Sequence, residues 1–289
     1  MLSEVLTRVV LVVGFLLPIS LGLFVGLERL AATRTEWRSR FRISGPAILI
    51  VSAVLLLNRT IRQDGTGFGI HMTSTIVRIE GEFVLIFQKI ASPELTTYFS
   101  FIYVYGYTFL LVFPVVAYFA LSDTKMFRRL LTAYAFNYAL GLVLYALVIA
   151  YGPRNVFVDE LIASASSGTG SSTILYDHTP EFKYLTREVN RNTNVFPSLH
   201  TSLSATVGIF AYLTRSSYPK WLPIAVVLAV SVIISTMYLG LHWGIDVLAG
   251  LVLAVLCVAL SYRLVGRWSL SELSEQLSER LSDIDRDRF

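Results

Sequence analysis

Seven long apolar runs constrain this chain more than any other feature of its sequence. A helix needs about 20 mostly apolar residues to cross a bilayer. The candidate spans are residues 9–27, 43–58, 96–121, 130–152, 198–214, 221–240 and 243–262. The run at 43–58 is short, and whether it crosses is left open. The runs predict an all-α fold, a polytopic membrane helical bundle of six to seven transmembrane helices.

The composition agrees with a membrane protein. Of the 289 residues, 54% are hydrophobic and 15% are charged, whereas a soluble protein carries about 25% charged residues. The net charge is +4, but the Lys and Arg residues lie mostly between the apolar runs. They therefore indicate membrane topology and contacts with lipid headgroups, and no nucleic-acid partner is expected. The single cysteine, Cys257, excludes a disulfide within the chain.

The distribution of basic residues predicts the orientation of the bundle. Lys and Arg cluster in segments 29–42, 122–129 and 215–220, and again at the end of the last span. In a seven-span arrangement these segments all fall on one side, which the positive-inside rule makes cytoplasmic. The C-terminus is then cytoplasmic, and the long loop 153–196 faces the outer side.

Two further segments are expected to lie on the membrane surface. Segment 63–95 contains "TIVRIEGEFVLIFQKI", whose interspersed charges predict an interfacial amphipathic helix. The tail carries leucines at helical spacing and is expected to be a cytoplasmic amphipathic helix. The predicted parts are therefore residues 1–122 with the first spans, residues 123–266 as a catalytic bundle, and the tail 267–289.

Polar residues gather where three of the predicted spans reach the outer side. His242 and Asp246 are four residues apart and share one helical face. Such residues are costly within a membrane and are usually functional. His200, in "NVFPSLHTSLS", and Arg154, in "YGPRNVF", fall at the same depth.

These residue types suit phosphoryl transfer. The start of the helix at Ser198, with the hydroxyls of Ser198 and Thr201, forms an anion site. Arg154 offers a planar fork of donors for phosphate oxygens. His200 can protonate a leaving oxygen, and Asp246 can orient His242 so that its other ring nitrogen attacks phosphorus. No metal and no cofactor are expected.

Two of these motifs resemble the type 2 phosphatidic acid phosphatase superfamily. "PSLH" matches its Pro-Ser-x-His motif, and "STMYLGLHWGID" keeps the Ser, His and Asp of its following motif at the family spacing. The resemblance covers the fourth to seventh spans. It implies that His242 is the nucleophile, Asp246 its orienting partner and His200 the acid for the leaving group.

The chain also departs from the phosphatases of that superfamily. Thr236 stands where they carry a phosphate-binding arginine, and their first motif is absent, so Arg154 is a substitute. With "FPSLH" and "MYLGLHWGIDVLAG", these departures resemble the branch of inositol phosphorylceramide synthase and sphingomyelin synthase. That resemblance implies transfer of a phospho-headgroup from one lipid to another alcohol.

The sequence therefore predicts a membrane enzyme that acts on a lipid phosphate at the outer leaflet. The acceptor, water or the hydroxyl of a second lipid, is left open, and so is a homo-oligomer. Two other hypotheses use the same residues. The chain could be a proton-coupled transporter based on His242 and Asp246, or a catalytically inactive scaffold that binds lipid phosphate.

Overall fold

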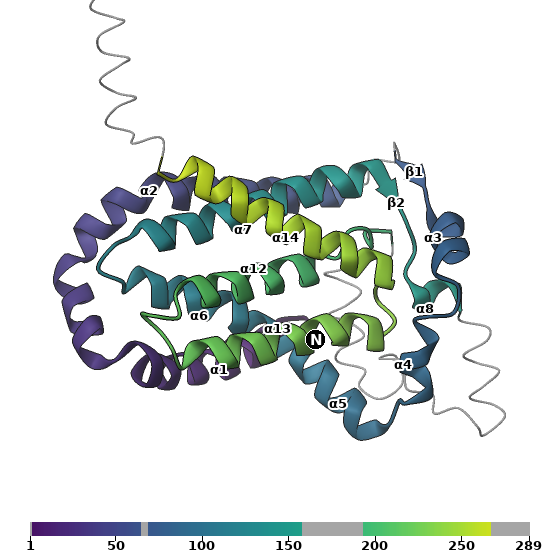
Figure 1. Ribbon diagram of the computed structural model, residues 1–289, viewed down its shortest axis with the longest axis horizontal. Helices are drawn as coiled ribbons and strands as arrows, with labels where there is room; N and C mark the ends of the chain where they lie inside the picture. Colours follow the sequence, from purple (N-terminus) through teal and green to yellow (C-terminus); the bar gives the residue numbers. More distant parts are fainter. Residues whose placement is uncertain (1, 65–68, 158–192, 267–289) are drawn as a thin grey trace, which may run out of the picture.

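The computed structural model describes residues 2–64, 69–157 and 193–266, and this part is almost entirely helical (Figure 1). The all-α bundle predicted from the apolar runs is confirmed. Its main helices are α1 (Leu2–Ser20), α2 (Leu27–Asp64), α5 (Pro93–Phe101), α6 (Tyr107–Phe119), α7 (Lys125–Leu147), α12 (Leu199–Leu213), α13 (Trp221–Tyr238) and α14 (Gly244–Leu264). Two π-helical turns, η1 (Leu21–Val25) and η2 (Ile102–Gly106), continue α1 and join α5 to α6.

Six helical segments of the described residues are long and apolar enough to cross a membrane. The seventh candidate, α12, has 15 residues and is therefore about 22 Å long. It packs against α6, α7, α13 and α14 in the middle of the bundle. Its side chains Leu203, Val207 and Phe210 are fully buried. A helix enclosed by its neighbours need not match the bilayer thickness by itself.

α12 and α14 approach each other closely at Gly250. A Cβ atom at this position would lie 2.5 Å from the carbonyl oxygen of Ser198. The missing side chain lets the first turn of α12 rest directly on α14. This contact sets the relative height of the two helices that carry the predicted histidines.

The boundaries differ from the sequence prediction in two places. The segment 43–58 lies within the single long helix α2, and the basic segment 29–42 is helical as well, where a connecting loop was expected. The predicted span 130–152 ends as a helix at Leu147, and Val148–Ile149 forms strand β2. β2 pairs in parallel with β1 (Ile70–His71). The last residues of the predicted span therefore form a strand and not a helix.

Short elements cover one end of the bundle. Helices α3 (Thr73–Glu80), α4 (Leu85–Lys89) and α8 (Pro153–Val156) lie at the end where α12 and α14 begin (Figure 1). One continuous interfacial helix was expected over this part of 63–95. The chain instead breaks at Gly81, whose φ of 60° is in the left-handed region that favours glycine.

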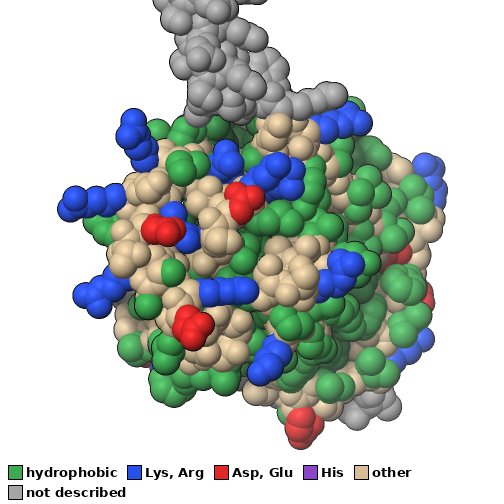
Figure 2. Space-filling model, turned by 60° about the vertical axis from the view of Figure 1, so that its left-hand side comes forward, with side chains coloured by type: hydrophobic (Ala, Val, Ile, Leu, Met, Phe, Trp, Pro, Cys, Tyr) green, Lys and Arg blue, Asp and Glu red, His purple; other side chains and the backbone are tan. Residues whose placement is uncertain are grey.

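The predicted basic segments meet at the opposite end. Arg29 of α2 donates to the carbonyl of Ser217, and Arg40 donates to the carbonyls of Phe119 and Leu121. Figure 2 shows blue Lys and Arg side chains spread over this end. The predicted basic segments therefore share one end of the bundle, away from α3, α4 and α8.

Two segments for which the sequence makes a prediction are not among the described residues. The serine-rich part of loop 153–196 and the amphipathic tail 267–289 lie outside the described residues.

Candidate active site

The loop between α13 and α14 carries His242. The carbonyl of Thr236 accepts hydrogen bonds from the amides of Leu241 and His242, at 3.0 and 3.1 Å. Gly240 has a φ of 65°, a conformation that residues with a side chain rarely adopt. The loop is thus a tight turn that returns the chain to the start of α14, and His242 directly precedes the N-cap residue Trp243.

The ring of His242 is held through Nδ1. This nitrogen lies 2.9 Å from the carbonyl oxygen of Val195 and 3.6 Å from Oδ2 of Asp246. A carbonyl oxygen only accepts, so Nδ1 carries a hydrogen, and in the neutral ring Nε2 then keeps its lone pair. The sequence predicted Asp246 as the orienting partner, and the shorter contact is to a backbone group that the sequence analysis did not consider.

Asp246 also shapes the backbone around His242. Its Oδ2 accepts a 2.7 Å hydrogen bond from the amide of Trp243, the N-cap residue of α14. The side chain is fully buried. One carboxylate therefore caps the helix that follows the nucleophile candidate and places a negative charge beside its imidazole.

His200 lies in the first turn of α12 and faces His242. The two ring centroids are 6.3 Å apart. At this separation one phosphate group can lie within reach of both rings, as attack by one imidazole and proton transfer by the other require. His200 also packs between Tyr103 and Tyr107, with centroid distances of 4.6 and 4.5 Å. These tyrosines come from η2 and α6, which the sequence analysis had not linked to the site.

Arg154 reaches the same turn from α8. Its backbone amide donates to the carbonyl of Gly240 at 2.9 Å, and its side chain is buried. Gly152 makes the approach possible, because a Cβ atom there would lie 2.5 Å from the carbonyl oxygen of Leu241. The structure therefore brings Arg154 next to the turn that holds His242.

Ser198 and Thr201 lie beneath this site and are fully buried. The Ser198 hydroxyl accepts from the amide of Thr201 as the N-cap of α12, and the Ser198 amide donates to the carbonyl of Asp246. The Thr201 side chain packs near Gly250. These contacts position the first turn of α12, which carries His200. The buried Oγ1 of Thr201 has no hydrogen-bond partner among the described residues, and phosphate binding by Ser198 and Thr201 stays a prediction.

Glu80 is a residue of this end that the sequence analysis did not single out. Its two carboxylate oxygens accept hydrogen bonds from the amides of Gly244 and Ile245, at 2.8 and 2.9 Å. These amides open α14, where a negative charge is favourable. The sequence offers no signal that separates Glu80 from the neighbouring Glu82, because the contact spans 164 residues.

Two large aromatic residues of the site end are buried. The exposed fractions of Tyr238 and Trp243 are 1% and 0%. The Trp243 indole donates to the carbonyl of Tyr151, and the Tyr238 hydroxyl lies 3.0 Å from that of Thr96. Both rings therefore lie inside the protein at the site end, and their polar atoms form hydrogen bonds there.

Fold and site together define a helical integral membrane protein with two facing histidines at one end of its bundle. A family model described as the PAP2 superfamily matches residues 75–260, so the chain belongs to that superfamily. The match begins within α3, before Glu80, and so includes the short helices at the site end. No match was found among curated proteins or among solved structures. Membership supports a phosphatase-type function for this membrane protein.

Proposed function

We propose that the protein is a lipid-phosphate phosphatase or phosphotransferase that works through a phosphohistidine intermediate. The observation that carries this proposal is the pair of imidazoles, with ring centroids 6.3 Å apart and Nδ1 of His242 held by the Val195 carbonyl. One ring has its nitrogen Nε2 available for attack, and the other can transfer a proton.

In the first step Nε2 of His242 attacks phosphorus, and the bond from phosphorus to the leaving alcohol breaks. His200 gives its proton to the departing oxygen, and the imidazole of His242 now carries the phosphoryl group. The positive charge that forms on this ring is stabilised by Asp246, whose Oδ2 lies 3.6 Å from Nδ1. Arg154 binds the phosphoryl oxygens with its guanidinium.

In the second step an incoming hydroxyl attacks the phosphohistidine. His200 takes the proton from this hydroxyl, and Nε2 of His242 leaves as a neutral ring nitrogen. With water the product is phosphate or a phosphomonoester, and with a lipid alcohol it is a new phospholipid. No metal is required in either step.

The environment of Thr236 supports transfer of the phosphoryl group to an alcohol. The superfamily's phosphatases carry a phosphate-binding arginine at this position, whereas the Thr236 hydroxyl here donates to the carbonyl of Ile233 and is buried. Phosphate binding then depends on Arg154. We assign the chain on this basis to the branch that resembles inositol phosphorylceramide synthase and sphingomyelin synthase.

The active site is proposed to face the outer leaflet. The basic residues gather at the end of the bundle opposite α3, α4 and α8 (Figures 1 and 2). The positive-inside rule makes the basic end cytoplasmic.

The experiment supplies purified protein with labelled phospholipids, with and without a second lipid alcohol, and separates free phosphate from transferred headgroup. The proposal expects one or both products from the wild type and none from His242→Ala. His71→Ala is the matched control, because His71 is exposed on β1 outside the site. Turnover by His242→Ala at the rate of the control would defeat the proposal. Solute uptake that follows a pH gradient would favour the transporter instead.

A further inference from the structure

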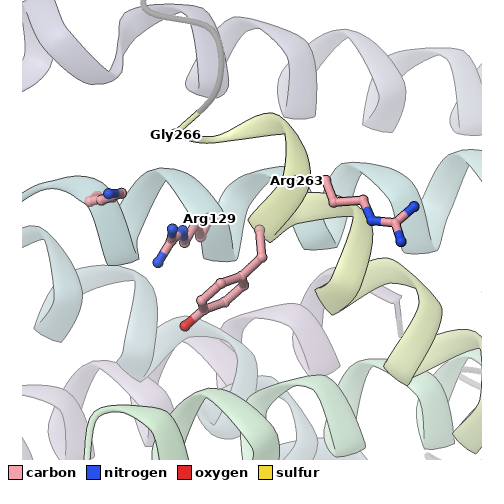
Figure 3. A pocket seen from close by; sticks show the side chains of 5 residues that line it. Arg129, Arg263 and Gly266 are labelled. Atoms are coloured by element: carbon pink, nitrogen blue, oxygen red, sulfur yellow. The ribbon is translucent and has the colours of Figure 1, made fainter.

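A polar hollow lies at the basic end, away from the two histidines. It has a volume of about 660 Å³ and is lined by Lys125, Arg129, Tyr262, Arg263 and Gly266. Figure 3 shows Arg129 and Arg263 on either side of the last turn of α14. Among these lining residues three are cations and none is acidic. The hollow therefore has the size of a ligand site and a strongly positive lining.

Two of the cations converge on one point. A Cβ atom built on Gly266 would lie 3.8 Å from Nζ of Lys125 and 3.6 Å from Nη2 of Arg129. Lys125 and Arg129 are also one turn apart on α7, an arrangement of like charges that destabilises a helix. Within the described part of the chain neither forms an ion pair with a carboxylate. An anion held at Gly266 would relieve this repulsion.

The remaining contacts fix the shape of the hollow without neutralising it. The Arg129 guanidinium lies 3.8 Å from the centre of the Tyr262 ring, and its Nε donates to the carbonyl of Val265. Asp123 is the nearest carboxylate along the sequence, and its Oδ1 accepts from the backbone amide of Lys125. The guanidinium is thus held in place by an aromatic face and a neutral carbonyl.

The position of the hollow identifies the kind of anion. It lies between the first turns of α7 and the last turn of α14, two helices long and apolar enough to cross the membrane. In a bilayer that these two helices cross, such helix ends reach the level of the lipid headgroups. Leu264, in the last turn of α14, is 46% exposed and can contact an acyl chain. Basic pockets between transmembrane helices on the cytoplasmic side bind anionic lipid headgroups.

We propose that this hollow is a binding site for the phosphate headgroup of an anionic phospholipid, separate from the catalytic site. Lys125 and Arg129 bind the phosphate at Gly266, Arg263 contacts the headgroup at the rim, and the acyl chains lie along α14. The proposal does not depend on the chemistry at His242, because the two sites lie at opposite ends of the bundle.

The experiment reconstitutes the full chain in phosphatidylcholine vesicles that contain a photoreactive phosphatidylglycerol. After irradiation, peptides containing residues 125–129 and 262–266 are expected to carry the label. Lys125→Gln and Arg263→Gln should each lower this labelling about fivefold, since one basic residue near an anionic surface contributes about that factor. Arg215→Gln is the matched control, because Arg215 is an exposed cation at the same end that does not line the hollow.

Three results would overturn the proposal. Equal labelling by photoreactive phosphatidylcholine would mean that charge is not recognised. Complete competition by inorganic phosphate at the ionic strength of the buffer would mean that the ligand is a free anion. In a parallel sample treated with a carbodiimide, amide crosslinks from Lys125 to carboxylates of the tail 267–289, with no lipid label at the hollow, would assign it to the acidic residues of the chain itself. Retained phosphatase or transferase activity in Lys125→Gln would leave the catalytic proposal untouched.

Discussion

His242 has two partners at the same nitrogen, and they differ in kind. The Val195 carbonyl is neutral and lies at 2.9 Å, whereas the Asp246 carboxylate is charged and lies at 3.6 Å. The neutral carbonyl suffices to fix the tautomer, because it can only accept. The carboxylate adds charge, which matters when the ring becomes positive during phosphoryl transfer.

If the Val195 carbonyl fixes the tautomer and Asp246 supplies only charge, Asp246→Asn should lower kcat mildly. The side-chain oxygen of Asn can still accept from the Trp243 amide, and the Val195 carbonyl keeps Nδ1 protonated. We expect kcat to fall about 10- to 100-fold, as for loss of a supporting partner, and not the roughly 10⁴-fold that accompanies a wrong tautomer. Steady-state kinetics with a labelled phospholipid measure this change. A loss as large as that of His242→Ala would mean that Asp246 alone orients the ring.

A second prediction at this scale concerns His200. As a general acid it should contribute about 10²- to 10⁴-fold to the rate. His200→Ala should therefore lose this factor on a phospholipid, whose alkoxide leaving group needs a proton. The variant should recover most of it on a phosphate ester of a nitrophenol, whose leaving group does not. Equal losses on both substrates would contradict the assigned role and would indicate a structural one.

Among the helices, the start of α14 accepts support from two carboxylates. Asp246 caps it from within, and Glu80 of α3 binds the amides of Gly244 and Ile245. α3 belongs to the segment expected at the membrane interface. A surface helix is thus connected by one carboxylate to the helix that follows His242.

We predict that Glu80→Gln destabilises this connection. The amide group of Gln offers one acceptor oxygen and leaves one α14 amide without a partner, at a cost of about 1–3 kcal/mol. The expected result is a lower Tm in detergent, together with a reduced kcat at similar KM. Glu82→Gln is the control, since Glu82 is exposed two residues away. If both variants behave alike, Glu80 does not position α14.

The elements that could be predicted are those with a local signature. The spans follow from apolar runs, and His200, His242 and Asp246 follow from their spacing and motifs. Contacts that join distant backbone groups have no such signature. The Val195 carbonyl, the Glu80 carboxylate and the stacking of Tyr103 on His200 arise only when four separate segments meet. The break at Gly81 was missed because one glycine does not outweigh the apolar periodicity around it.

At the scale of the whole molecule, the two ends have different characters. One end holds the histidines, and the other gathers basic residues from four segments. Contacts at the site cross the predicted boundary at residue 123, because Glu80, Tyr103 and Tyr107 lie before it and contact residues that follow it. We infer that residues from α3 to α14 act as one catalytic unit, in agreement with the family match over 75–260.

The orientation of this unit leads to a prediction about labelling. In intact cells a membrane-impermeant thiol reagent should react with His71→Cys at the site end, and with Ser216→Cys at the basic end only after permeabilisation. Both positions are exposed, and the native Cys257 is fully buried, so the background should be low. The reverse pattern would place the active site on the cytoplasmic side.

The proposed function requires that His242 carries the phosphoryl group. The most direct measurement is to mix the protein with a phosphate-labelled lipid, quench in alkali within the first turnover, and map the label by mass spectrometry. We expect label on the peptide that contains His242, and none in His242→Ala. Product formation by the wild type with no labelled histidine, or with the label on His200, would contradict it.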